Sequence, residues 1–184
     1  MNNSGLKSPA RLIAVSGVKN SGKTTLLSAL IPVLKNKGLK VGLIKHDGHD
    51  FLPDVPGSDS FKLRQAGADP VAVYSPKRYM LTVETNDFSL DKILPHFEGT
   101  DLILLEGGKA APWPKIEVLR GKVSQTPVCD PETLLAIYTD TGISLPGVPA
   151  VGFGDILQLA DIIMSFVKKQ ALLESDGQKS ALAR

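Results

Sequence analysis

The 184-residue sequence is poor in the residues that build disulfides and transition-metal sites: it has one cysteine, Cys129, and three histidines. A single cysteine cannot form an intrachain disulfide, so a disulfide framework is excluded and a reducing, cytoplasmic setting is expected. The same scarcity argues against an NTP-dependent metallochaperone, which would need a cluster of cysteine or histidine ligands.

Long apolar runs and a strong excess of one charge are also missing. No apolar run approaches the ~20 residues that a membrane-spanning helix needs. The first ten residues, MNNSGLKSPA, lack the apolar centre of a secretion signal, so we expect a flexible leader at 1–10. The formal net charge is +2, and we therefore expect neither nucleic acid nor a membrane as a partner.

What the sequence does contain is a phosphate-binding motif. Residues 17–24 read GVKNSGKT and match the Walker A pattern G-x-x-x-x-G-K-[ST]. The apolar run at 12–16 predicts a buried strand before the motif, and the leucine spacing within 24–37 predicts a helix after it. A strand and a helix on either side are the context that the motif requires, which disfavours the alternative of an ordinary Gly/Ser-rich turn.

The chemistry of phosphate binding assigns a role to each part of this loop. Gly17 and Gly22 let the backbone approach a phosphate, and the N–H groups at the helix N-terminus attract the anion. Lys23 brings a full positive charge to the β- and γ-phosphates and is the predicted catalytic residue, while the Thr24 hydroxyl is a predicted Mg²⁺ ligand. The predicted nucleotide-binding residues of the loop are Gly17, Val18, Lys19, Asn20, Ser21, Gly22, Lys23, Thr24 and Thr25.

Strands and helices are predicted to alternate along the rest of the chain, which indicates an α/β fold with a largely parallel central sheet and some antiparallel strands. We expect a three-layer fold like that of P-loop NTPases, with one nucleotide-binding domain at 11–170 and a polar, frayed tail at 171–184. Further strands are expected at 39–44, 71–74, 79–84, 102–105, 116–119, 134–138 and 150–153. Further helices are expected at 60–65, 89–97 and 156–167, with a kink or break at Pro32 in the first helix.

A carboxylate for the metal can be chosen from the direction of the strands. In an open α/β sheet, ligands bind beyond the carboxyl ends of the parallel strands. Asp101 and Glu106 bracket the same predicted strand, but only Glu106 lies at the end that also carries Thr24. We therefore predict that Glu106 binds Mg²⁺, directly or through water.

The same edge should collect the residues that follow the strand at 39–44. Asp47 is predicted to support the Mg²⁺ shell or to orient water, and Lys45, His46 and His49 to contact a substrate or partner. A solvated loop remains an equal interpretation for His49. A zinc site is not expected, because these residues have no helical spacing and no third, distant ligand.

Thr139 and Asp140 end a later strand and are candidates for base recognition. A carboxylate can accept hydrogen bonds from both N1–H and the exocyclic amine of guanine, whereas adenine offers no matching pair of donors. Asp140 is therefore predicted to read a guanine edge and Thr139 to position its loop. The Asn-Lys-x-Asp pattern of many GTPases is absent, so the residues favour guanine only modestly.

Few residues are available to accelerate hydrolysis. No glutamine directly follows the Glu106-Gly107-Gly108 turn, and no arginine stands out as a finger near the P-loop. Since a missing arginine finger costs about 10³–10⁵ in rate, slow turnover is predicted.

The sequence resembles the GTP-binding adapter proteins of molybdopterin guanine dinucleotide biosynthesis, the MobB family. The segments that carry the resemblance are GVKNSGKTTLL at 17–27, GLIKHDGHD at 42–50, PGSDSFKLRQAGA at 56–68, ET at 84–85, DLILLEGGK at 101–109 and PKIEV at 114–118. The chain departs from the family after Glu106, where Gly108-Lys109-Ala110 replaces an aromatic residue and a Lys-His pair.

The resemblance implies a homodimer that binds GTP with Mg²⁺, hydrolyses it weakly and assists the guanylyltransferase that joins GMP to molybdopterin. It also implies contacts to the pterin or to that enzyme, for which the candidates are Lys45, His46, His49, Arg64 and Lys109. An adapter role is favoured over an independent catalyst. The alternative is an ATP-dependent metabolite ligase or kinase similar to dethiobiotin synthetase, which also pairs a P-loop with a late Glu-Gly-rich turn.

Overall fold

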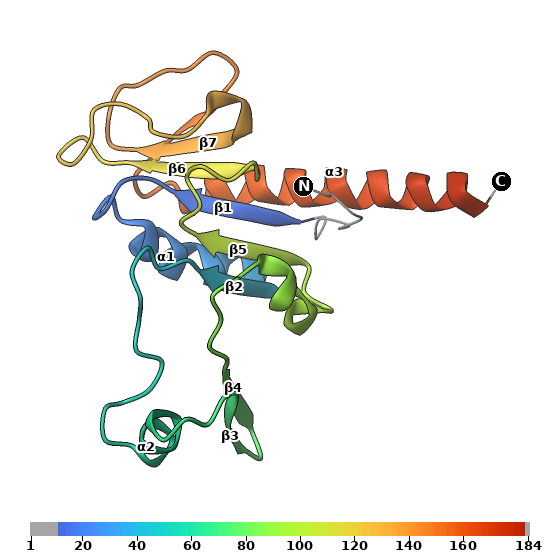
Figure 1. Ribbon diagram of the computed structural model, residues 1–184. Coiled ribbons are helices and arrows are strands. Elements are labelled where there is room, and N and C mark those ends of the chain that lie inside the picture. The colour runs from blue at the N-terminus through green and yellow to red at the C-terminus, as the bar shows by residue number, and fades with distance from the viewer. Residues whose placement is uncertain (1–10, 183–184) are drawn as a thin grey trace. The chain divides into compact units, whose positions relative to one another are not determined.

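A computed structural model describes residues 11–182 of the chain, with the side chains described up to residue 173 (Figure 1). The described residues form two compact units, one made of 11–46 and 94–182, the other of Asp47–Ile93. The leader predicted at 1–10 lies outside the described residues. Among the described residues, no helix is long and apolar enough to cross a membrane.

The first unit is built on a six-stranded sheet in the order β2-β5-β1-β6-β7-β8, in which every neighbouring pair is parallel (Figure 1). Its strands are β1 (Leu12–Ser16), β2 (Val41–Lys45), β5 (Leu102–Glu106), β6 (Lys115–Leu119), β7 (Leu134–Thr139) and β8 (Ala150–Gly152). The predicted fold class, an α/β fold with a mainly parallel sheet, is confirmed. Because the strands are parallel, all their carboxyl ends lie at one edge.

Two helices, α1 (Lys23–Asn36) and α3 (Ile156–Leu182), pack on one face of this sheet. Ile13 and Val15 alternate toward that face and share a fully buried cluster with Leu30 and Ile163. On the other face of β6 and β7, Leu119 and Ile137 pack against Cys129 and the loop residues Ile143, Leu145 and Val148. Apolar side chains therefore pack on both faces of the sheet and fix the positions of the strands.

Three elements differ from the sequence-based expectation. The kink or break predicted at Pro32 is not a break, because α1 continues to Asn36 with the buried Leu34 anchoring its last turn. The helix predicted at 89–97 is two short 3₁₀ helices, η1 (Leu90–Lys92) and η2 (Leu94–Phe97), since Pro95 cannot donate the backbone bond that a continuous α-helix needs. The final helix continues to Leu182, through most of the expected polar tail, because that segment is rich in good helix formers.

The second unit contains α2 (Asp59–Gln65) and a hairpin of β3 (Val71–Ser75) and β4 (Arg78–Thr82). The predicted cap is confirmed, since the Ser58 hydroxyl accepts a hydrogen bond from the Phe61 N–H at 3.2 Å. The predicted antiparallel hairpin is also confirmed. Large apolar side chains of this hairpin are exposed: Val73, Tyr74, Tyr79, Met80 and Leu81.

Candidate functional site

The loop between β1 and α1 has a backbone that only small or permissive residues can adopt. Gly17 and Gly22 have φ values of +139° and +103°. A Cβ atom on Gly17 would lie 2.5 Å from the Val118 carbonyl oxygen, so no side chain fits there. Asn20 has φ +63°, a left-handed conformation that asparagine tolerates better than most residues. The loop thus presents backbone N–H groups at close range, as a phosphate cradle requires.

Lys23, the first residue of α1, folds back over this loop. Its ammonium group donates to the carbonyl oxygens of Val18 at 2.8 Å and Gly17 at 3.3 Å. Neutral carbonyls are weaker partners for an ammonium group than anionic oxygens. The lysine is therefore placed over the cradle with an interaction that a phosphate can replace.

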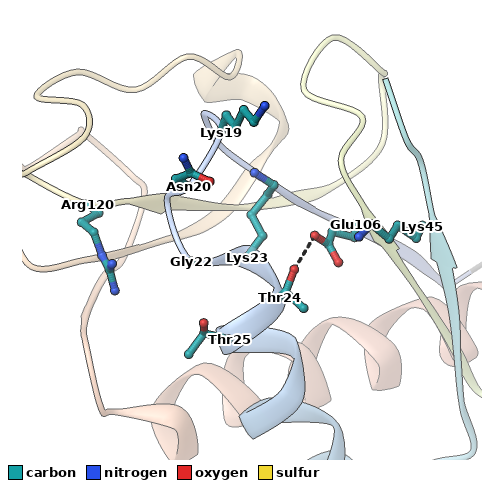
Figure 2. A pocket seen from close by; sticks show the side chains of 9 residues that line it. All are labelled: Lys19, Asn20, Gly22, Lys23, Thr24, Thr25, Lys45, Glu106 and Arg120. Atoms are coloured by element: carbon teal, nitrogen blue, oxygen red, sulfur yellow. Dashed lines mark hydrogen bonds between the residues drawn. The ribbon is translucent and has the colours of Figure 1, made fainter. Parts of the chain in front are cut away.

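Thr24 and Glu106 meet directly at the carboxyl edge of the sheet. The Thr24 hydroxyl donates to the Glu106 carboxylate at 2.7 Å (Figure 2). Asp101 lies at the opposite end of β5, where its carboxylate accepts from the Lys40 N–H at 2.7 Å. This is the separation that strand direction predicts, and only Glu106 shares the edge with the P-loop.

A cavity of about 450 Å³ opens over these residues (Figure 2). It is lined by Lys19, Asn20, Gly22, Lys23, Thr24, Thr25, Lys45, Glu106 and Arg120. Four of these side chains are cationic and one is a carboxylate, so the cavity favours an anionic ligand. Its volume is within the ~300–1,000 Å³ typical of small-molecule sites.

The oxygen atoms of Thr24 and Glu106 are the kind of ligand that Mg²⁺ prefers. Over residues 11–182, no group of three or more His, Cys, Asp or Glu side chains could hold a metal ion. A magnesium ion at this edge would take its remaining ligands from phosphate and water, which is the usual pattern for Mg²⁺ in nucleotide sites. The donor set therefore fits a nucleotide-bound magnesium ion.

The residues predicted to contact a substrate or partner are divided between the two units. Lys45 stands opposite Glu106 in the register of β2 and β5 and lines the cavity. The backbone N–H of His46 donates to the Glu106 carbonyl oxygen at 3.0 Å. Lys109 is exposed in the turn after β5. These three belong to the unit that carries the P-loop.

The other three candidates from this region, Asp47, His49 and Arg64, belong to the second unit. The Asp47 carboxylate accepts from the His49 N–H at 3.2 Å, and the Arg64 guanidinium donates to Glu84 at 3.0 Å. These contacts stabilise the local structure of that unit. The predicted roles of the three residues in metal, substrate or partner binding stay predictions.

Thr139 ends β7 and Asp140 follows it, but neither residue lines the cavity. The Asp140 carboxylate accepts from the Gly121 N–H at 2.7 Å, which ties the end of β7 to the turn after β6. The buried Thr139 hydroxyl accepts from the Thr141 N–H at 3.0 Å. Base recognition by this pair stays a prediction, with one Asp140 oxygen already engaged.

The sequence singles out no arginine as a finger near the P-loop, but the structure places one arginine at the cavity. Arg120 directly follows β6 and lines the cavity beside Gly22 (Figure 2). The strand-end rule that selected Glu106 applies equally to the predicted strand at 116–119, and Arg120 is the first residue beyond it. The signal was therefore present in the sequence.

A buried polar cluster supports this edge from the other face of β6. Glu117 is buried and its carboxylate accepts from the N–H groups of Val128 at 2.6 Å and Cys129 at 3.1 Å. The buried Lys115 ammonium donates to Trp113 and Thr133, and burial lowers its pKa. Burial, followed by the Glu117 carboxylate, raises the pKa of the Cys129 thiol to about 12. The thiol is therefore neutral and inert at physiological pH.

Known proteins match both the sequence and this architecture. The family model described as molybdopterin guanine dinucleotide synthesis protein B (MobB) matches residues 12–140. The chain belongs to the MobB family. The match runs from the start of β1 to Asp140 and contains every residue that lines the cavity.

Individual MobB relatives extend this similarity over most of the chain. The chain is 36% identical over 167 residues to the molybdopterin-guanine dinucleotide biosynthesis adapter protein of Escherichia coli, and the alignment covers 86% of this chain and 94% of the relative. It is 34% identical to the protein of the same name from Haemophilus influenzae, over 85% of this chain and 89% of that one. The crystal structure of Bacillus subtilis MobB aligns with a TM-score of 0.67 and 28% identity, over 85% of this chain and 97% of that one.

Proposed function

We propose that this MobB-family chain is a GTP-binding adapter protein with weak GTPase activity, which assists the guanylyltransferase in molybdopterin guanine dinucleotide biosynthesis. The observation that carries the nucleotide part is the cationic cavity over the P-loop, with the Thr24–Glu106 pair at its edge. The pathway is proposed from the names of the MobB relatives. A cytoplasmic location is part of the proposal.

The P-loop would bind the phosphates through its backbone N–H groups and through Lys23. The Lys23 ammonium is 2.8 Å from the Val18 carbonyl, and on binding it would exchange this neutral partner for β- and γ-phosphate oxygens. Thr25, on the first turn of α1, would donate to the phosphate nearest the nucleoside. Lys45, opposite Glu106, would add positive charge on the γ-phosphate side.

Thr24 and Glu106 would hold Mg²⁺, with Asp47 as a further contributor to its shell. When bound, the ion neutralises charge on the β- and γ-phosphates. The Glu106 carboxylate now accepts from the Thr24 hydroxyl at 2.7 Å and is buried, so its position is set before any ligand arrives. This preorganisation supports binding more than turnover, since the residue directly after the Glu106-Gly107-Gly108 turn is Lys109 and not a glutamine that could orient a water.

Guanine specificity is proposed to come from Asp140, with Thr139 holding the loop. One Asp140 oxygen accepts from Gly121, and the second has capacity for the donors on the guanine edge. The bond to Gly121 limits the rotation of the carboxylate. Asp140 would therefore recognise the base from a fixed position.

The second unit is the proposed interface for assembly. A two-stranded hairpin is marginal alone, and this one exposes large apolar side chains, among them Tyr74 and Leu81. We propose that a homodimer covers them. The residues that contact the guanylyltransferase or molybdopterin would then be Lys45, His46, His49, Arg64 and Lys109.

The adapter role is tested by steady-state GTP hydrolysis with Mg²⁺, by the purified protein alone and with the guanylyltransferase. Turnover alone should stay well below ~1 s⁻¹, and the two proteins should co-elute when GTP is present. Fast turnover alone, or phosphorylation of a small acceptor without the partner, would instead support the kinase or ligase alternative.

A further inference from the structure

Arg120 occupies a position that the P-loop motif does not account for. The sheet order places β5 and β6 on the two sides of β1, so the residues at their carboxyl ends flank the P-loop. Glu106 ends β5 on one side, and Arg120 follows β6 on the other. Figure 2 shows the two side chains on opposite sides of the N-terminal end of α1.

The Arg120 guanidinium has no anionic partner. Among the residues that the structure describes, no carboxylate forms an ion pair with it and no acceptor takes one of its hydrogen bonds. The nearby Asp140 carboxylate bonds to the Gly121 N–H instead, at 2.7 Å. A half-buried guanidinium with five unused donors, lining a cavity, has the capacity to bind an anion.

The surrounding residues hold this side chain in place. Its guanidinium carbon lies 5.7 Å from the centre of the Phe153 ring, within cation–π range. Phe153 in turn stacks on Tyr138 with ring centres 4.8 Å apart, and the Tyr138 hydroxyl accepts from the Gly154 N–H at 2.8 Å. The Asp140–Gly121 bond fixes the backbone next to Arg120. An arginine held by aromatic stacking loses little entropy when it binds a ligand.

The Arg120 guanidinium lies close to the N-terminus of α1, next to Gly22. A Cβ atom on Gly22 would lie 3.7 Å from one terminal nitrogen of Arg120 and 3.9 Å from its central carbon. The guanidinium therefore lies within van der Waals distance of position 22, beside the N–H groups that bind phosphates.

We propose that Arg120 is a nucleotide-binding residue that donates hydrogen bonds to the phosphate nearest the nucleoside, the α-phosphate. Glu106 and Thr24 mark the side of the cavity where the metal and the terminal phosphates belong, and Arg120 lies on the other side. Its contribution is therefore to the binding of di- and triphosphates alike, not to the transfer of the γ-phosphate. This inference rests on the proposed function, because it assumes that the cavity holds a nucleotide.

The test measures equilibrium binding of GTP, GDP and guanosine to the wild type and to Arg120→Ala, Arg120→Gln and Arg120→Lys. Loss of the guanidinium should lower the affinity for GTP and the affinity for GDP by the same factor, about 10- to 100-fold, as for a lost hydrogen bond between charged groups. Weak binding of guanosine should not change, and Arg120→Lys should recover part of the loss. Lys122→Ala is the matched control, since it removes an exposed cation two residues away that does not line the cavity.

The other outcomes separate failure of the Arg120 inference from failure of the proposed function. Unchanged GTP and GDP affinity in folded Arg120→Ala and Arg120→Gln would overturn the inference and leave Arg120 as a stacking partner of Phe153. A lower hydrolysis rate with unchanged GDP affinity would also overturn it, in favour of a role at the γ-phosphate. If the wild type binds ATP and not GTP, the proposed function fails, while ATP and ADP still test Arg120. If it binds no nucleotide, both fail.

Discussion

At the scale of single residues, the site depends on charges placed around one loop. The cationic side chains and the Thr24–Glu106 pair act on different parts of a bound nucleotide, so their substitutions should have separable effects. Lys23 is the clearest case, because its ammonium contacts only loop carbonyls and no part of the core.

Lys23→Ala should lower GTP affinity by about 100-fold, since it removes the ammonium group that lies over the P-loop and is aimed at the β- and γ-phosphates. The free energy of unfolding should stay within about 0.5 kcal/mol of the wild type, as for a surface substitution. Calorimetric titration and urea unfolding measure the two quantities. Wild-type affinity in the variant would show that this loop is not the nucleotide site.

Glu106→Gln and Asp101→Asn form a matched pair of neutral substitutions at the two ends of β5. Only the first should weaken Mg²⁺-dependent GTP binding and hydrolysis, because Glu106 contacts Thr24 whereas Asp101 caps the Lys40 N–H. Hydrolysis rates over a magnesium titration compare the two. A larger effect of Asp101→Asn would overturn the assignment of the metal to the carboxyl edge.

At the scale of elements, the functional residues are positioned by the ends of the strands and by glycines in closely packed turns. The strand–loop–helix context, the parallel sheet and the side of β5 that carries the acid could all be predicted, because they follow from local hydrophobic spacing and strand direction. Arg120 was missed although the same rule applied to its strand. The Asp140–Gly121 bond could not be predicted, because it joins two loops whose conformations are not encoded in any local pattern.

Gly17→Ala should destabilise the fold, because its Cβ atom would meet the Val118 carbonyl oxygen at 2.5 Å in a left-handed backbone. Gly38→Ala is the control, since Gly38 also has a positive φ but nothing lies within 4 Å of a Cβ there. Gly17→Ala should lose more than the ~1–3 kcal/mol of backbone strain that both variants share. Equal losses in urea unfolding would mean that the loop moves away from β6 without cost.

The reactivity of the Cys129 thiol measures how closely the cluster around Leu119 of β6 is packed. Its pKa is raised from 9.0 to about 12 by burial and then by Glu117. Folding thus favours the neutral thiol, and this stabilisation is present below pH 9.0 and lost as the pH rises toward 12. A thiol-alkylating reagent near neutral pH should react much more slowly with native protein than with urea-unfolded protein. Similar rates would contradict a closed cluster.

At the scale of the whole molecule, the two units differ in how well their apolar side chains are buried. The first has a buried core and a complete cavity, while the second is a short helix and a hairpin with exposed apolar side chains. The hairpin was predicted from its turn residues, but its partner could not be, because covering an exposed surface depends on another molecule. The resemblance, and not the residue pattern, pointed to a dimer.

Tyr74 and Leu81 lie on one face of the hairpin, on paired strands. Replacing both with aspartate should shift the protein from dimer to monomer in sedimentation experiments, because buried charges oppose association. Nucleotide affinity per chain should remain unchanged. Leu157→Asp, at an exposed apolar residue of α3, is the control and should leave the dimer intact. A monomeric wild type, or a double variant that is still dimeric, would contradict this interface.

The central claim, a Mg²⁺-dependent GTP site over the P-loop, is tested most directly by titrating the wild-type protein with GTP and ATP, each with and without Mg²⁺. We expect GTP to bind more tightly than ATP, and Mg²⁺ to strengthen GTP binding through Thr24 and Glu106. Asp140→Asn should weaken the preference for GTP. Tighter binding of ATP, or GTP binding that does not respond to Mg²⁺, would contradict the account.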